Sequence, residues 1–226
     1  VWNLNSDEAS SLDFTKPWWD TKMIDGFAIN DMVFFATGDM MTLDNDATFV
    51  MMFNKTLARE AQLPDLYSMV SNYEWTFDKL AQYVQLINDG DGINEYDKGT
   101  CGFAITDDVF YSMFYAGGLS VATKEDDGTI AFGLNVERGQ NVADAAKLIF
   151  AKDYIVNINS VATSTGVGVP EIGQTVFGDS HSLFIGEVLQ CVERFRGFDV
   201  DFGVIPYPMY DTAQGEYYHM MHLLYD

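Results

Sequence analysis

The chain has 226 residues, 48% hydrophobic and 15% aromatic, a composition that can fill a folded core and that differs from a disordered one. Its 34 acidic residues outnumber 12 basic ones, and the formal charge of -22 excludes nucleic acids and anionic membranes as partners, because both would be repelled. The sequence has no apolar run of the roughly 18 residues that a membrane-spanning helix needs, and no export signal at its start.

Two apolar runs in the first quarter of the chain predict buried strands. Residues 32–36 and 48–53 are almost entirely apolar, and each run is followed by turn-forming or polar residues. Residues 55–62 then place apolar side chains on one face and stop before Pro64, which predicts a short helix. The second run is therefore predicted to be a strand that leads directly into a helix.

The clearest helix is predicted to begin after Thr76, whose hydroxyl can accept a hydrogen bond from a free N–H group of the first turn. Apolar residues follow at helical spacing, at Leu80, Tyr83, Val84 and Ile87. Trp75, just before the helix, is placed to pack on Leu80 as a hydrophobic staple. We therefore interpret Trp75 as a structural residue.

Later segments continue the alternation of strands and helices. Residues 109–117 and 136–152 carry apolar side chains at helical spacing, whereas residues 102–105, 182–186 and 201–206 have the apolar character of strands. Strands that alternate with helices over this length indicate an α/β layer architecture.

The two cysteines, Cys101 and Cys191, are expected to be buried free thiols. An oxidising compartment would allow them to pair, and the sequence leaves that alternative open because it does not show the distance between them.

Neither a metal site nor a cofactor is predicted. Oxygen-bearing side chains gather around two glycines in one turn, at Asp89, Asp91, Asn94 and Glu95. The calcium-loop pattern fails at both ends, because Ile87 stands at the first ligand position and Lys98 at the position of the bidentate Glu. His219 and His222 have no carboxylate or thiolate beside them in the sequence that would complete a zinc set.

The sequence does not predict an enzyme. It contains no Gly-x-Ser-x-Gly motif, and neither cysteine has the neighbours of a catalytic thiol. With 34 acidic residues, pairs of carboxylates are bound to occur, so they do not by themselves indicate glycoside hydrolysis.

Four short motifs, in order along the chain, carry a resemblance to a known family. They are Phe-Asn-Lys at 53–55, Tyr-Glu-Trp-Thr-Phe-Asp at 73–78, Asn-Asp-Gly-Asp-Gly at 88–92 and Asp-Phe-Gly-Val-Ile-Pro-Tyr-Pro at 201–208. In this order and at these separations they resemble the extracellular solute-binding proteins of bacterial ABC importers, of the sugar-binding family 1 type.

The resemblance implies a periplasmic-binding-protein fold of type II, in which two α/β lobes face each other across a ligand cleft. It places residues 1–46 in part of the first lobe and the first crossing, and residues 47–173 in the second lobe. Residues 174–200 would return into the first lobe, and residues 201–226 would form a crossing strand and the start of a truncated C-terminal segment. Chains of this family are longer, so the resemblance also implies a central fragment.

Members of the family place ligand contacts in segments that this sequence matches. A sugar site needs flat aromatic faces and planar polar side chains that pair with adjacent hydroxyls. The resemblance assigns these roles to Trp18, Trp19, Asp39, Asp46, Thr48, Asp107, Asp108, Phe110, Tyr111, Glu187 and Gln190. The sequence departs from the family at residues 186–190, which lack the aromatic residue that many sugar binders have there.

The function implied is capture of a sugar or oligosaccharide, without chemistry, by a monomer that delivers it to the membrane permease of an ABC importer. The location implied is outside the cytoplasm, as a periplasmic protein or a cell-surface lipoprotein. Within the same fold, the ligand is alternatively a peptide, an amino-acid derivative or a polyamine, the last favoured by the acidic surface. A carbohydrate-degrading enzyme is the alternative of another class.

Overall fold

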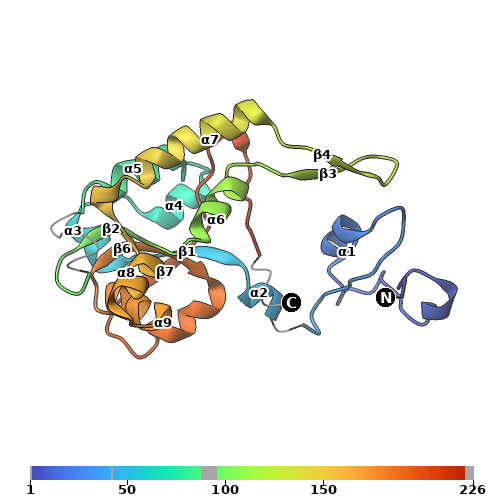
Figure 1. The fold of residues 1–226 in the computed structure, drawn as a ribbon, viewed down its shortest axis with the longest axis horizontal. Coiled ribbons are helices and arrows are strands. Elements are labelled where there is room, and N and C mark those ends of the chain that lie inside the picture. The colour runs from blue at the N-terminus through green and yellow to red at the C-terminus, as the bar shows by residue number, and fades with distance from the viewer. Residues whose placement is uncertain (1, 42, 88–95, 222–226) are drawn as a thin grey trace.

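The computed structural model describes residues 2–41, 43–87 and 96–221 (Figure 1). Its centre is a mixed five-stranded sheet in the order β5-β2-β6-β1-β7. The strands are β1 (Phe49–Asn54), β2 (Cys101–Ile105), β5 (Ile155–Asn157), β6 (Ser182–Val188) and β7 (Phe202–Ile205). Strand β2 runs parallel to β5 and β6, whereas β1 runs antiparallel to β6 and β7, with Met51 opposite both Gly186 and Ile205.

The central strands are almost entirely buried, because helices cover both faces of the sheet. Every residue of β1 and β2 is buried, which explains why their sequences are continuous apolar runs without alternation. In Figure 1 helices α5 and α7 lie along one side of the sheet, and α8 and α9 lie on the other. The helices are α3 (Lys55–Glu60), α4 (Leu66–Ser71), α5 (Phe77–Val84), α6 (Val109–Ala116), α7 (Val136–Ile149), α8 (Ile158–Thr165) and α9 (Val169–Gly173).

Most predicted elements are confirmed. The run at 48–53 is strand β1, and it leads into α3, where the Asn54 side chain accepts hydrogen bonds from the first-turn amides of Thr56 (2.9 Å) and Leu57 (3.0 Å). The predicted helices near 109–117 and 136–152 are α6 and α7, and the late strands are β6 and β7. Residues 182–188, which we expected to return into the first lobe, form β6 in the centre of the sheet, between β2 and β1.

Trp75 is fully buried, as its predicted structural role requires. Its indole stacks against Tyr83 and lies against Phe184, and the indole N–H donates to the carbonyl oxygen of Pro206 at 3.0 Å. This hydrogen bond joins the segment before α5 to the segment after β7. Trp75 thus links two parts of the chain that are far apart in sequence.

Two details of the α5 prediction are wrong. Thr76 occupies the N-cap position, but its side chain makes no capping hydrogen bond. The first amide of the helix, that of Phe77, donates to the carbonyl oxygen of Met209 at 2.8 Å, so a neighbouring segment pairs one of the free first-turn amides. The helix also ends at Val84, before Ile87.

The predicted strand at residues 32–36 is also wrong. Only Val33 in this run is buried, and its backbone carbonyl accepts from Leu4 while its amide donates to the Asn3 side chain. A strand needs a ladder of partners along its length, and the described part of the chain offers this run isolated bonds only. Val33 packs with Ile24 and Ala28 in a second, small apolar cluster that is separate from the main core.

Residues 2–41, which include α1 (Thr21–Phe27), form a smaller unit around this cluster. In Figure 1 it lies beyond α2 (Leu43–Asp46), at the end of the molecule away from α3. A hairpin of β3 (Ala122–Lys124) and β4 (Ile130–Phe132) reaches toward it, and Lys124 Nζ donates to the carbonyl oxygen of Asp25 at 2.8 Å.

The segment after β7 is held against α7 by Arg138. Its guanidinium lies 4.1 Å from the centre of the Tyr210 ring and donates to Gln214 Oε1 at 3.1 Å. Gln214 in turn donates to the carbonyl oxygen of Ala116 at the end of α6. The segment therefore packs firmly on the helical layer.

Both cysteines are buried free thiols, as expected. Burial raises the pKa of Cys101 to about 11 and that of Cys191 to about 12, so neither is a thiolate at neutral pH.

Candidate functional site

One edge of the sheet collects the polar residues that follow its strands. The carboxyl ends of β2, β5, β6 and β7 meet the amino end of β1 at this edge, because β1 alone runs in the opposite direction. Ligands of open α/β sheets bind outside the carboxyl ends of the strands. We call this edge the candidate site.

Asp107 is held in place by two asparagines from the β5–α8 junction. Asn157 Nδ2 donates to Asp107 Oδ1, and the backbone amide of Asp107 donates to Asn159 Oδ1, both at 3.0 Å. Asn157 also caps α8, since its side chain accepts from the amide of Ser160 at 2.8 Å. The loops after β2 and β5 are thereby joined into one polar surface.

Glu187 is the largely buried carboxyl group of the site. It lies near the end of β6. Its Oε2 accepts a hydrogen bond at 3.3 Å from the thiol of Cys191, which follows the strand. Burial raises the pKa of Glu187, and the nearby charge of Asp108 adds to that rise, while the Cys191 hydrogen bond and the charge of Arg194 oppose it. The environment thus favours the neutral form of this carboxyl group more than water does.

Tyr207 lies against Gly186, the residue before Glu187 in β6. Tyr207 follows β7 and is fully buried, and its hydroxyl lies near the Ser112 side chain, which opposes the rise of its pKa. Burial raises the pKa of Tyr207 far above its usual value, so the hydroxyl stays protonated. Gly186 leaves room for it, because a Cβ atom at that position would lie within 2.3 Å of the hydroxyl oxygen.

Two aromatic side chains stand at the start of α6. Phe110 is 50% exposed and Tyr111 is 63% exposed. Phe110 rests on Phe150, with ring centres 4.4 Å apart, so one side of its ring is supported by the protein. Exposed rings beside planar polar groups are what binding to a sugar ring requires.

Asp46, Thr48 and Gln190 meet at the amino end of β1. The carbonyl oxygen of Thr48 accepts from the amide of Leu189 at 2.8 Å, which places Gln190 next to this strand end. Asp46 ends α2 and is half-buried. Together with Asp107, Asp108, Phe110, Tyr111 and Glu187, these residues belong to the segments that meet at the candidate site.

The remaining predicted residues, Trp18, Trp19 and Asp39, belong to the smaller unit. Trp19 packs edge-on against Phe14, with ring centres 5.1 Å apart, and contributes to the small apolar cluster. Trp18 is 44% exposed, and its carbonyl oxygen accepts from the amide of Asp39 at 2.8 Å. The structure therefore brings these three together but gives Trp19 a packing role.

Several residues of the site were not predicted from the sequence, namely Asn157, Asn159, Cys191 and Tyr207. Asn157 had a detectable signal, because it follows the apolar residues Ile155 and Val156 at the start of a helix. No sequence signal places Tyr207 against Gly186, because the two residues are far apart in the sequence and meet only when β6 and β7 join the same sheet.

Within the described residues, no group of three or more His, Cys, Asp or Glu side chains is arranged to hold a metal ion. The turn at Asp89–Glu95 and His222 lie outside the described residues. No helix in the described ranges has both the length and the apolar character needed to cross a bilayer.

No protein-family model matches the chain, and a search of curated proteins finds no match. Solved structures do match. An ABC substrate-binding protein from Listeria monocytogenes in complex with cycloalternan is 14% identical, with a TM-score of 0.59 over 92% of this chain and 47% of that one. UgpB from Mycobacterium tuberculosis in complex with glycerophosphocholine is 14% identical, with a TM-score of 0.56 over 92% and 46%. A maltotriose binding protein from Thermus thermophilus bound with maltotriose is 17% identical, with a TM-score of 0.53 over 92% and 47%.

These likenesses establish the fold. The chain has the mixed α/β architecture of type II periplasmic binding proteins, and it spans about half the length of the solved chains that it matches.

Proposed function

We propose that the protein is the substrate-binding component of an ABC importer and captures a sugar or oligosaccharide between two lobes. The main support is the shared fold with substrate-binding proteins, two of which are solved with cycloalternan and maltotriose. In this proposal the sheet and its helices form one lobe, and residues 2–46 belong to the other. The candidate site is then one wall of the cleft.

The side chains at the site favour a neutral, hydroxylated ligand over a polyamine. Burial disfavours a charge on Glu187, and one oxygen of Asp107 already accepts a hydrogen bond from Asn157, an arrangement of planar polar groups that pairs with hydroxyls. Phe110 and Tyr111 add exposed ring surface beside these polar groups. A sugar uses both features, because its C–H faces lie on rings while its hydroxyls pair with planar polar side chains.

In this proposal the protein binds its ligand and catalyses no reaction. Closure of the two lobes buries the ligand and changes the outer surface of the protein. The permease recognises the closed form, so transport depends on the ligand shifting the population from the open to the closed form. The proposed protein acts as a monomer outside the cytoplasm, either free in the periplasm or anchored to the cell surface as a lipoprotein. A carbohydrate-degrading enzyme would instead release product from an oligosaccharide.

A ligand panel tests the proposal. The intact protein is heated with maltotriose, raffinose and glucose, and with spermidine, a tripeptide and glycerophosphocholine as contrasts, because a ligand of the folded state raises the melting temperature. We expect at least one sugar to raise the melting temperature. We also expect that sugar to remain uncleaved after long incubation with the protein. A rise with spermidine or the tripeptide alone, or cleavage of maltotriose, would contradict the proposal.

Variants locate the binding surface. Replacing Phe110 and Tyr111 together by Ala should weaken sugar binding about tenfold or more, since each stacked ring contributes roughly 1 kcal/mol. The Trp18→Ala and Trp19→Ala pair tests the opposite wall in the same way. Phe132→Ala is the matched control, because that ring is 75% exposed on the hairpin. Equal loss of affinity in the control would remove the assignment of the site.

A further inference from the structure

The hairpin of β3 and β4 extends from the helical layer of the sheet to the unit of residues 2–41 (Figure 1). It lies between α6 and α7 in the chain, and the amide of Gly133 ties its base by donating to the carbonyl oxygen of Val121 at 3.0 Å. Every residue of β3 is exposed, and so are two of the three residues of β4. A two-stranded hairpin without a buried face is marginally stable in water, so contacts at its far end help to hold it in place.

Two tight turns meet at the tip of the hairpin. Gly128 has a left-handed backbone, with φ of 80°, and its carbonyl oxygen accepts from the amide of Asn30 at 3.2 Å. Asn30 and Asp31, with φ of 49° and 59°, form a two-residue turn between Ile29 and Met32, whose backbones exchange two hydrogen bonds. Those two bonds do not use the amide of Asn30, which is therefore available to Gly128.

A lysine from the hairpin contacts the end of α1. Lys124 Nζ donates to the carbonyl oxygen of Asp25 at 2.8 Å. This carbonyl group belongs to the last turn of a helix, where carbonyl groups lack partners in a following turn and carry partial negative charge. The last turn of α1 contains no basic residue of its own. The hairpin therefore supplies, from a distant part of the chain, a cation that stabilises the carboxyl end of α1.

Acidic residues are present on both sides of this contact. Residues 125–127 at the tip of the hairpin are Glu, Asp and Asp, and Asp25 and Asp31 belong to the segment that the tip contacts. These side chains carry the same charge, on a chain whose formal charge is -22, so they oppose the approach of the hairpin. Lys124 offsets part of this repulsion. Because the contact depends on a few polar groups at an exposed surface, it is weak enough to open and close.

We propose that the β3–β4 hairpin is a strap that holds the unit of residues 2–41 beside the sheet and releases it when the contacts of Lys124 and Gly128 break. The chain also joins the two units through the segment that contains α2, and a connection of this kind permits them to rotate apart. The strap adds a second connection, so it favours joined molecules, in which both contacts are made, over separated ones. This inference goes beyond the proposed function and needs no ligand.

Distances between spin labels on the two units, measured by pulsed electron paramagnetic resonance, test the proposal in the absence of ligand. The labels are attached at Ser11→Cys in the smaller unit and at Ala143→Cys on α7, which are both exposed positions. Cys101 and Cys191 are buried and protonated, so they react slowly with the label. Lys124→Met should raise the ratio of separated to joined molecules about fivefold at low ionic strength, as for loss of a charge-assisted hydrogen bond at an exposed site.

Two control variants separate the strap from a general effect of charge. Lys79→Met makes the same change of charge at an exposed position of α5, and it should leave the distances unchanged. Lys124→Arg keeps a cation that can reach the carbonyl oxygen of Asp25, so it should restore most of the joined population.

Hydrogen exchange locates the change within the smaller unit. The amide of Asn30 donates to Gly128, so its exchange should become about fivefold faster in Lys124→Met, in proportion to the separated population. The amide of Ile24 donates to the carbonyl oxygen of Asp20 at 3.0 Å, within the unit itself. Its exchange should keep the same rate, because the unit stays folded when the strap releases it.

The proposal is overturned if Lys124→Met and Lys79→Met give the same distances, or if Lys124→Arg behaves as Lys124→Met does. It is also overturned if the exchange of Ile24 accelerates as much as that of Asn30, since the unit would then unfold instead of being released.

Sugar affinity gives a separate expectation that rests on the proposed function. A sugar that binds between the joined units should bind Lys124→Met up to about fivefold more weakly, because fewer molecules are joined. If the units separate and the sugar affinity stays the same, the sugar does not bind between them, and the proposed function is contradicted while the strap stands. Failure of every sugar to bind would likewise contradict the proposed function alone.

Discussion

Gly186→Ala is expected to destabilise the protein through a clash that a second substitution relieves. The new Cβ atom would lie 2.3 Å from the Tyr207 hydroxyl oxygen and 2.8 Å from Cγ2 of Val109. Favourable contacts between non-bonded atoms lie near 3.5 Å, so about 1 Å of movement is needed in a fully buried region. Overpacking of this kind costs about 1 to 3 kcal/mol, and we expect Gly186→Ala to lower the free energy of unfolding by that amount.

Tyr207→Phe removes the oxygen atom that causes the closer of the two contacts. The substitution removes at most one neutral hydrogen bond, to Ser112, whose own hydroxyl still donates to the carbonyl oxygen of Asp108, so it should cost about 1 kcal/mol or less. In the double variant the clash of the new methyl group is reduced to the Val109 contact. We therefore expect Gly186→Ala to cost at least about 1 kcal/mol less in the Tyr207→Phe background than in the unaltered protein.

Urea unfolding of the four proteins, followed by circular dichroism, measures this coupling. The slope of the free energy of unfolding against urea concentration should be the same for all four proteins. Equal slopes would show that each protein exposes the same amount of surface on unfolding, so that their free energies can be compared directly. If the two changes are simply additive, the hydroxyl of Tyr207 does not lie against Gly186, and the contact that we describe between them is wrong.

Three further predictions concern stability. Burial raises the pKa of Glu187 above 4.5, so the folded protein binds this proton more tightly than the unfolded chain and loses stability as pH rises past that value. Glu187→Gln, which cannot ionise, should melt higher than the unaltered protein at pH 8 and nearly equal to it at pH 4; an equal difference at both pH values would contradict this. Trp75→Phe removes the donor to the Pro206 carbonyl and leaves a small cavity. It should lower the free energy of unfolding in urea by about 2 to 4 kcal/mol. A loss below about 1 kcal/mol would contradict the packing of Trp75. Arg138→Met should cost about 1 to 2 kcal/mol and speed hydrogen exchange around Tyr210, and unaltered exchange there would show that the cation does not hold the segment.

Local patterns were sufficient where an element depends on its own residues. The apolar run at 48–53 predicts β1 because a strand buried on both faces has apolar side chains throughout. The predicted helix at 136–152 corresponds to α7 (Val136–Ile149), in which Asn135 accepts the first capping bond from the amide of Arg138. In both cases the information lies within a few residues of the element, so no distant contact is needed to recognise it.

Predictions failed where the outcome depended on a distant partner. Residues 32–36 have the composition of a strand, but a strand exists only where another backbone pairs with it. Thr76 has the chemistry of a cap, yet the amide of Phe77 bonds to Met209, which is far away in the sequence. Sequence alone does not show which distant carbonyl group will pair with the first amide of a helix.

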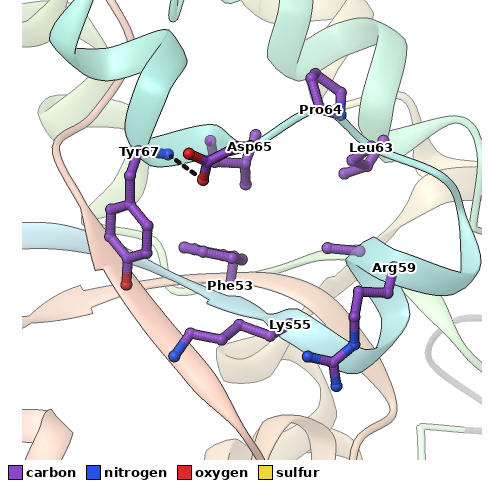
Figure 2. A pocket seen from close by; sticks show the side chains of 9 residues that line it. Phe53, Lys55, Arg59, Leu63, Pro64, Asp65 and Tyr67 are labelled. Atoms are coloured by element: carbon purple, nitrogen blue, oxygen red, sulfur yellow. Dashed lines mark hydrogen bonds between the residues drawn. The ribbon is translucent and has the colours of Figure 1, made fainter.

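The sequence by itself determined the α/β class, the main helices and strands, and the segments that supply Asp107, Asp108 and Glu187 to the candidate site. Composition, periodicity and short motifs are local properties, and they were readable without coordinates. Only the tertiary structure decided that β6 lies between β2 and β1, that Cys191 bonds to Glu187 and Tyr207 lies against Gly186, and that a pocket lined by Phe53 and Tyr67 lies at the other end of β1 (Figure 2). These features arise when strands distant in sequence pair in one sheet, because that pairing sets which side chains become neighbours.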